Sequence, residues 1–384
     1  MTWMLLALLF SPPILINSYI TSFIIVSSVA FVCLAKSKIL KPQFDSQLFL
    51  IWFPFLIVGA FVPFYYGDST AIWDLRYFLL PITLIFFFLG FYSYYQQLSI
   101  ANLYKRVCQI FVFFLFINSL LSLWWIFDRS SLGFLDVYNK FHESGYGVSN
   151  YWRYIGLYGN PNFDAAMFGY GLLFLIALGL SKLSKWWMIP LAVLIVMGLF
   201  STLSRSVIAA LIMVPIINSL IQLPKILARL SVRNILVGFL ILIIASMIAL
   251  ITYSVLVEVK FAFFLDNIGR LSRVFDYFSN ERFKLVLFYM DYFSNNTLSF
   301  VLGNFAYKPE ISLYSSGFTD NDYLYFVLKY GLVGVSLIVW LQVYSYIIGA
   351  RLDEQKTDSV SSSIGKYLKY SSIFSLVLAI ASVP

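Results

Sequence analysis

The sequence predicts an all-α protein, a polytopic membrane bundle of about eleven transmembrane helices, with a range of about 10 to 12. Hydrophobic residues make up 61% of the 384 residues, charged residues make up only 11%, and mean hydropathy is +0.85. Soluble domains carry about 25% charged residues, so this composition excludes the soluble globular class. Because each helix needs about 20 apolar residues to cross a bilayer, the chain suits a single integral membrane domain over residues 1–384.

Eleven apolar runs follow one another along the chain. The first two are short and are interrupted by Pro12 and Pro13, so one irregular hairpin is an alternative for them. The runs cover residues 2–17, 19–35, 47–65, 71–93, 107–127, 163–181, 186–202, 206–222, 234–257, 321–348 and 367–384.

Basic residues in the short loops predict the orientation of the helices. One set of alternate loops holds thirteen of the 26 Lys and Arg residues, whereas the opposite short loops, near 66–70 and 203–205, hold only Arg205. Lys and Arg gather in cytoplasmic loops, so the Lys-rich loops are expected inside. The two long loops, 128–162 and 258–320, are then expected outside, and an odd number of helices leaves the C-terminus outside as well.

The two long external loops differ in character. The first, 128–162, is polar and rich in Tyr and Gly. The second, 258–320, contains an apolar stripe at helical spacing, formed by Phe283, Val286, Leu287 and Met290. Basic residues flank that stripe, which predicts an amphipathic helix lying in the plane of the membrane interface.

The segment 153–162 reads RYIGLYGNPN and enters the sixth apolar run. Asn160 before Pro161 is typical of a helix N-cap followed by proline at the first helical position. That structural role does not account for Arg153 or for the density of aromatic residues and glycines. Aromatic faces beside small residues suit stacking on apolar sugar faces. Candidate glycan-binding residues are Tyr154, Tyr158, Asn160, Asn162 and, at the start of the tenth run, Tyr323.

A second motif, Ser201-Thr202-Leu203-Ser204-Arg205-Ser206, lies at a tight turn between two apolar runs. One interpretation is an Arg that reaches the interface, with hydroxyls that cap the helix ends. The functional interpretation is a guanidinium that binds phosphate, with the hydroxyls as additional donors. Arg suits that role because its planar fork bonds two oxygens at once.

Further cations are functional candidates. Arg76 lies about one turn inside a spanning segment, where an ionisable residue is costly. Asp74, two residues away, would not share its helix face and does not explain it. Arg273 and Arg282 lie in the second long loop, where attraction to anionic lipid headgroups is the alternative explanation.

Carboxylates precede the tenth apolar run. Thr319 with Asp322 three residues later imitates a capping box, which is the structural interpretation. The functional interpretation is a carboxylate base at the membrane surface, provided by Asp320 or Asp322. His142 is the only histidine, so serine–histidine hydrolase chemistry is not supported, and no glycine-rich phosphate loop occurs. The cations are spread over connecting loops, so no nucleic-acid partner is expected.

In this order, the segments resemble the O-antigen polymerase and O-antigen ligase family of bacterial envelope glycosyltransferases, over about residues 150–334. The matching features are Arg153 with Gly159-Asn160-Pro161-Asn162, Thr202-Leu203-Ser204-Arg205, Arg282 in an amphipathic segment leading to Leu302-Gly303, Asp320-Asn321-Asp322-Tyr323-Leu324, and Lys329-Tyr330-Gly331-Leu332-Val333-Gly334. The ligase pattern has a histidine where this chain has Asp320, which favours a polymerase.

The resemblance implies a mechanism and a place in the cell. Members of the family use undecaprenyl-pyrophosphate-linked glycans at the periplasmic face of the bacterial inner membrane. A polymerase transfers the glycan to a sugar hydroxyl of another lipid-linked repeat unit. The residues expected to bind pyrophosphate are Arg153, Arg205, Arg282, Arg76 and Arg273, and those expected to act in catalysis are Asp320, Asp322 and Arg205.

The resemblance also implies partners. These are the lipid-linked oligosaccharide, membrane lipids and a protein that regulates chain length, with no cofactor or metal required. One alternative is a ligase that transfers the glycan to lipid A core. An alternative from another class is a lipid-linked oligosaccharide flippase or an anion transporter. Transporters tend to show inverted repeats and polar breaks at the bilayer midplane. Here no repeat occurs and the polar groups gather on one side, which favours an enzyme.

Overall fold

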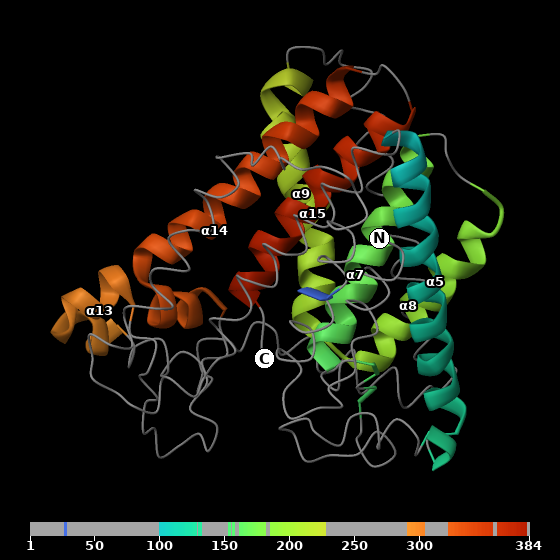
Figure 1. Cartoon of the computed structure of the whole chain (residues 1–384), viewed down its shortest axis with the longest axis horizontal. Helices are drawn as coiled ribbons and strands as arrows, with labels where there is room; N and C mark the ends of the chain where they lie inside the picture. The colour runs from blue at the N-terminus through green and yellow to red at the C-terminus, as the bar shows by residue number, and fades with distance from the viewer. Residues whose placement is uncertain are drawn as a thin grey trace.

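The computed structural model describes residues 27–28, 100–128, 130–132, 153–154, 156–157, 161–181, 185–227, 290–303, 322–355 and 359–381. Every regular element in these segments is a helix, and no strand occurs among them (Figure 1). The all-α prediction is therefore confirmed for the part of the chain that the structure describes.

Five helices pack side by side as a bundle (Figure 1). They are α5 (Ile100–Phe127), α7 (Pro161–Leu180), α8 (Met188–Thr202), α9 (Arg205–Leu227) and α15 (Ser359–Ala381). A short 3-10 helix, η2 (Ser130–Leu132), follows α5. The long helix α14 (Asp322–Gln355) packs against α15 and also contacts the short helix α13 (Thr297–Leu302), which lies away from the bundle.

Among the described residues, three helical segments are long and apolar enough to cross a membrane. They are Tyr104–Phe127, Pro161–Leu180 and Gly331–Glu354. Two shorter apolar helices, Met188–Thr202 and Ser206–Gln222, lie beside them. By length and composition, these segments indicate a membrane protein. The predicted runs 2–17, 47–65, 71–93 and 234–257 lie outside the described residues, as does 19–35 apart from helical residues 27–28.

The six predicted runs that fall in the described part each correspond to a helix, but the helix ends differ from the run ends. The helix α5 begins seven residues before its run (residue 107), and α15 begins eight residues before its run (residue 367). The residues before each run include polar and charged ones, such as Lys105 and Arg106 of α5, which propagate a helix well although they are not apolar. Hydropathy therefore finds the apolar part of a helix, whereas the backbone continues beyond it.

The tenth run corresponds to α14, whose helical conformation is interrupted at one residue. At Gly331 the backbone has φ 66° and ψ −174°, which interrupts the helical conformation inside α14. The apolar spanning part begins there, at Gly331–Glu354. A side chain at this position would clash with the backbone oxygen of Val301 in α13, so only glycine allows α13 to approach this closely.

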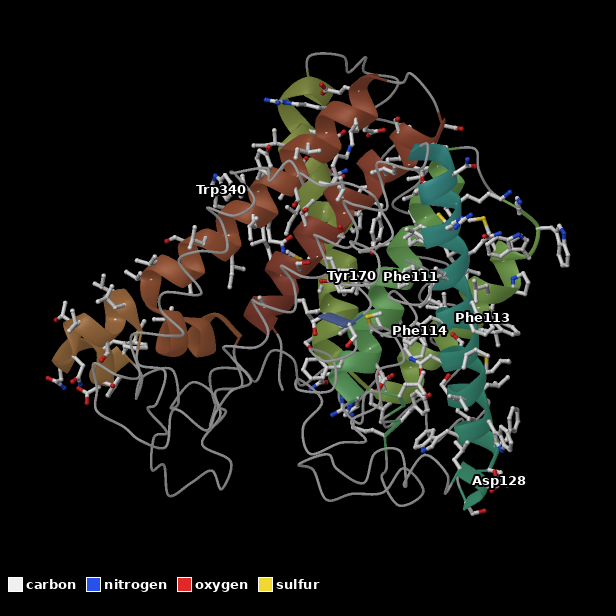
Figure 2. All side chains as sticks on the ribbon, in the orientation of Figure 1. Phe111, Phe113, Phe114, Asp128, Tyr170 and Trp340 are labelled. Atoms are coloured by element: carbon white, nitrogen blue, oxygen red, sulfur yellow. The ribbon has the colours of Figure 1, made fainter. Side chains whose placement is uncertain are left out.

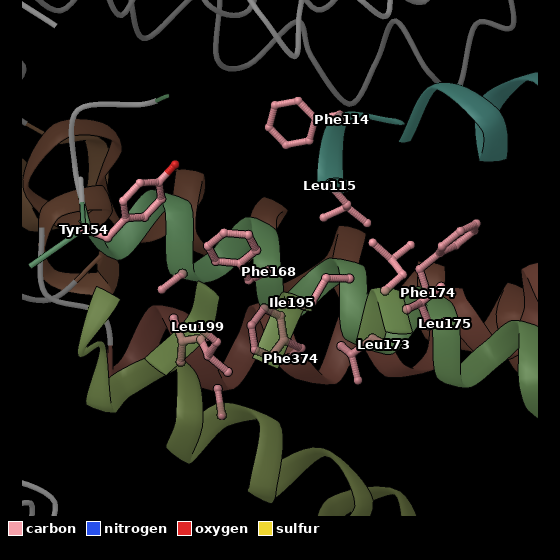
Figure 3. Close-up of a cluster of buried hydrophobic side chains, with 14 of the residues drawn as sticks. Phe114, Leu115, Tyr154, Phe168, Leu173, Phe174, Leu175, Ile195, Leu199 and Phe374 are labelled. Carbon is pink, nitrogen blue, oxygen red and sulfur yellow. The ribbon is translucent and has the colours of Figure 1, made fainter. Parts of the chain in front are cut away.

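Small residues allow the bundle helices to approach one another. A Cβ atom on Gly198 of α8 would lie 2.7 Å from the ring of Phe168 in α7. Phe168 is fully buried and belongs to a hydrophobic cluster with Phe374 of α15 and Ile195 of α8 (Figure 3). Helix interfaces in membranes favour such small residues because lipid supplies no hydrophobic drive and close packing must hold the helices together.

Basic residues mark one end of the bundle, which we call the Lys-rich end. Lys366 of α15 donates hydrogen bonds to the Leu180 carbonyl, 3.3 Å away, where α7 ends. Both Lys366 and Lys369 form ion pairs with Asp353 near the end of α14, at 3.4 and 2.7 Å. The hydroxyls of Tyr104 and Ser363, 2.6 Å apart, bring the start of α5 to the same end. Basic residues at or near this end include Lys105, Arg106, Lys185 and Arg351.

Candidate functional site

At the opposite end of the bundle, Arg153 joins the motif of residues 153–162, predicted to bind glycan, to the motif of residues 201–206, predicted to bind phosphate. Its Nε donates to the carbonyl oxygen of Thr202 at 2.7 Å, and its Nη2 donates to Oδ1 of Asn162 at 2.9 Å. The hydroxyl of Ser204 donates to the same Asn162 oxygen at 3.1 Å. We call Arg153, Asn162, Thr202 and Ser204 the Arg153 cluster. Asp128, the residue after α5, also lies at an end of the bundle (Figure 2).

The turn between α8 and α9 has a conformation that brings these groups together. The helix α8 ends at Thr202 because Leu203 adopts the left-handed conformation, with φ 54° and ψ 29°. Its backbone N–H donates to Phe200, which closes the last turn. The next helix begins only two residues later at Arg205. A left-handed leucine is uncommon and costs energy, so the surrounding contacts must hold the turn in place.

Two hydroxyls of this motif do not have the role proposed for them as phosphate donors. Ser201 Oγ donates to the Gly198 carbonyl at 2.7 Å, and Thr202 Oγ1 donates to the Leu199 carbonyl at 2.6 Å. Both residues are buried. The structural interpretation, in which hydroxyls satisfy the last carbonyls of a helix, therefore holds for these two. The Ser204 hydroxyl instead connects α9 with the first turn of α7.

Two helix N-termini meet at the Arg153 cluster. The helix α7 begins at Pro161, the first helical position that the sequence predicts, and Asn162 follows it. Ser204 immediately precedes Arg205, the first residue of α9. Each helix N-terminus carries a partial positive charge of about +0.5 and presents backbone N–H groups. With the guanidinium of Arg153, they place positive groups at this end of the bundle, and such groups suit an anion such as phosphate.

Tyr154 lies in the protein core, which corrects its assignment as a sugar-stacking residue. Its side chain is fully buried. The ring lies 6.2 Å from that of Trp125 in an edge-to-face arrangement and is stacked 6.5 Å from that of Phe168 (Figure 3). Its hydroxyl donates to Oδ1 of Asn118 at 2.8 Å. A ring enclosed on both faces has no surface to offer a sugar, so aromatic density in this loop reflects packing at Tyr154.

The other predicted site residues are distributed as follows. Arg205 begins α9, and Asp322 and Tyr323 begin α14. Residues outside the described part are Arg76, Tyr158, Asn160, Arg273, Arg282 and Asp320. Of the second long loop, the structure describes residues 290–303, where 290–295 are helical and α13 follows. The structure thus brings together Arg153, Asn162 and the turn before Arg205.

Two polar residues beneath the cluster were not predicted as functional. Asn118 of α5 and Asp164 of α7 are both fully buried, and Asn118 Nδ2 donates to Asp164 Oδ1 at 2.9 Å. A signal for them exists in the sequence, because each is a strongly polar residue within a mostly apolar run. Polar residues inside spanning segments are costly and are functional candidates for that reason.

Comparisons with protein families, with curated proteins and with solved structures find no match for this chain. The sequence motifs and the geometry of the Arg153 cluster are therefore the indications of function.

Proposed function

We propose that this protein is a membrane glycosyltransferase, a polymerase that lengthens an undecaprenyl-pyrophosphate-linked surface polysaccharide such as O-antigen. It transfers a glycan from undecaprenyl pyrophosphate to a sugar hydroxyl of a second lipid-linked repeat unit. The reaction takes place at the periplasmic face of the bacterial inner membrane. The proposal includes about eleven spanning helices and two long periplasmic loops, 128–162 and 258–320, the second with an amphipathic helix.

The observation that carries this proposal is the connection of Arg153 to Asn162 and to the turn before Arg205. Arg153 and Arg205 belong to different motifs of the family resemblance, separated by about fifty residues. Arg153 bonds to the turn directly before Arg205, beside the N-termini of α7 and α9. This supports a pyrophosphate site, since cations and N-termini both stabilise phosphate oxygens. We assign Arg282, Arg76 and Arg273 as further candidates to the same role.

The chemistry needs charge stabilisation more than proton donation. As the bond between the sugar anomeric carbon and the pyrophosphate oxygen breaks, negative charge grows on undecaprenyl pyrophosphate, which leaves with the bonding electrons. Arg153 and Arg205 stabilise that charge. The acceptor hydroxyl forms the new bond to the anomeric carbon, and its proton passes to a carboxylate, for which Asp320 and Asp322 are the candidates. Asp322 is the first residue of α14, and Asp320 stands two positions earlier in the sequence.

The arrangement of charge supports the proposed orientation. Basic side chains gather at the Lys-rich end, whereas the Arg153 cluster lies at the other end of the same helices, such as α7. Lys-rich ends face the cytoplasm in membrane proteins. The cluster then faces the periplasm, where lipid-linked repeat units are available.

Removing one guanidinium tests this function. We expect Arg205→Ala to abolish chain lengthening, because one cation is lost where the leaving pyrophosphate develops charge, at a cost of about 10²- to 10³-fold in rate. The measurement is the length distribution of surface polysaccharide, with protein level and membrane insertion monitored in parallel.

A matched control is Lys185→Ala, which removes an exposed cation at the Lys-rich end and is expected to leave the length distribution unchanged. A normal polysaccharide ladder from the Arg205→Ala variant, at normal protein level, would contradict the proposed role of this residue.

A further inference from the structure

A fully buried carboxylate, Asp164, lies in the first turn of α7, two residues after Asn162 of the Arg153 cluster. It has no surface to offer a substrate, so a direct chemical role is excluded. A buried carboxylate in a membrane protein is costly and needs hydrogen-bonding partners. Its connections therefore indicate what it does.

A chain of hydrogen bonds leads from Asp164 to the residue beside Arg153. Asn118 Nδ2 donates to Asp164 Oδ1 at 2.9 Å, and Tyr154 Oη donates to Asn118 Oδ1 at 2.8 Å. The backbone N–H of Tyr154 donates to the Ser201 carbonyl at 3.0 Å. Arg153 directly precedes Tyr154 in the sequence. The hydrogen bonds that hold Tyr154 therefore also hold the segment that carries the guanidinium.

Asp164 determines which group donates and which accepts in this series of hydrogen bonds. Oδ1 of Asp164 accepts from Nδ2 of Asn118, so the NH₂ group of Asn118 faces Asp164. The amide oxygen of Asn118 then faces Tyr154 and needs a donor. Burial, together with the charge of Asp164, raises the pKa of Tyr154 well above its usual value, so the phenol keeps its proton and donates.

The backbone of the segment also fits closely around Asp164. Gly156 has φ 43°, a left-handed conformation, and any Cβ at this position would collide with the carboxylate oxygen Oδ1. The segment thus passes directly over Asp164 at Gly156 and is tied to it through Asn118 at Tyr154. Two independent contacts define the path of the chain next to Arg153.

We propose that Asp164 is a positioning residue, which acts through Asn118 and Tyr154 to hold Arg153 in place for an anionic pyrophosphate group. The inference rests on the proposed function for its ligand, but the positioning itself follows from the hydrogen bonds above. Asp164, Asn118 and Tyr154 are all fully buried, so they position Arg153 without contacting the substrate.

Two substitutions test the inference in the full-length protein reconstituted in lipid nanodiscs. Tyr154→Phe keeps the packed ring and removes only the donor, and Asp164→Asn keeps the shape and removes the charge. The matched control is Tyr170→Phe, since the Tyr170 hydroxyl lies 2.6 Å from Ser375 Oγ on a different helix pair. The first measurement is amide hydrogen exchange at Tyr154, and the second is KM for a lipid-linked repeat unit.

We expect Tyr154→Phe and Asp164→Asn each to speed exchange at the Tyr154 amide about fivefold, the effect of one lost hydrogen bond, and to raise KM about fivefold. The double variant should add less than about twofold, because both changes break one chain. Tyr170→Phe should leave both quantities within about twofold of wild type. Tyr154→Phe carries the test alone if Asp164→Asn does not fold.

Equal exchange rates of the backbone amide at position 154 in the Tyr154→Phe and Tyr170→Phe variants would overturn the inference. So would an unchanged KM in Tyr154→Phe in a protein that lengthens glycans. A wild-type protein that lengthens no glycan would instead overturn the proposed function and leave the exchange result intact, so the two failures are distinguishable.

Discussion

Arg153 shows how far residue type alone leads toward a site. Its guanidinium bonds Thr202, which lies 49 positions later in the chain, and Asn162, which was expected to bind glycan. Residue type and position in the motif are enough to predict Arg153 and Asn162 as site residues. They do not predict that Tyr154, in the same motif, is buried, because an aromatic residue in a loop has the same local signal in a core as on a surface. Only the packing of α5 and α7 decides between them.

Because the guanidinium of Arg153 donates in two directions, the protein is predicted to be less stable with Lys at this position. Lys in place of Arg153 keeps the charge, but a single ammonium cannot reproduce the directions of Nε and Nη2 toward two acceptors. We expect Arg153→Lys to lower the free energy of unfolding by about 1.5–3 kcal/mol, the contribution of one hydrogen bond to a charged group. Unfolding in mixed micelles with rising denaturing detergent measures it.

The matched control for that prediction is Arg351→Lys, an exposed position at the Lys-rich end, where a change within about 0.5 kcal/mol is expected. If Arg153→Lys is as stable as wild type, the two hydrogen bonds do not hold the motifs together.

At the level of helices, the apolar runs predict where α5, α7, α8, α9, α14 and α15 occur, because a bilayer imposes its thickness on the sequence. They do not predict the helical residues before the runs in α5 and α15 or the interruption at Gly331. Those features depend on partners from other helices. At Gly331 the partner is α13, and the close contact between α13 and this residue cannot be predicted from the presence of a glycine alone.

The crossing of α14 and α15 depends on a pair of glycines. A Cβ atom on Gly349 would lie 2.7 Å from the carbonyl oxygen of Gly365, so Gly349→Ala must push the two helices apart. We expect the free energy of unfolding to fall by about 1–3 kcal/mol, the usual cost of overpacking. The same detergent unfolding experiment measures it.

Gly179→Ala is the control, because a Cβ there meets no atom within 4 Å. Alanine favours helix over glycine by about 1 kcal/mol, so this variant should be unchanged or more stable. If Gly349→Ala were as stable as the control, close packing of the two helices would not be what joins them.

For the whole molecule, the distribution of charge along the chain and the arrangement of the helices agree. Short loops rich in Lys and Arg alternate with short loops that hold only Arg205. In the described part, Lys366 lies beside the end of α7, while Arg153 lies beside its beginning. Sidedness of this kind can be predicted from sequence, since each helix that crosses the membrane reverses the side of the next loop. The hydrogen bonds that connect Tyr154, Asn118 and Asp164 could not be predicted from the sequence, because Asn118 and Asp164 lie on separate helices.

The most direct test of the central claim uses the purified protein in proteoliposomes supplied with undecaprenyl-pyrophosphate-linked repeat units. Product length and the side on which the glycan is exposed are measured together. We predict that glycans of two or more repeat units form, with release of undecaprenyl pyrophosphate, and that Arg205→Ala prevents their formation. Transfer of single repeat units across the bilayer without any lengthening would contradict the account and identify the protein as a transporter.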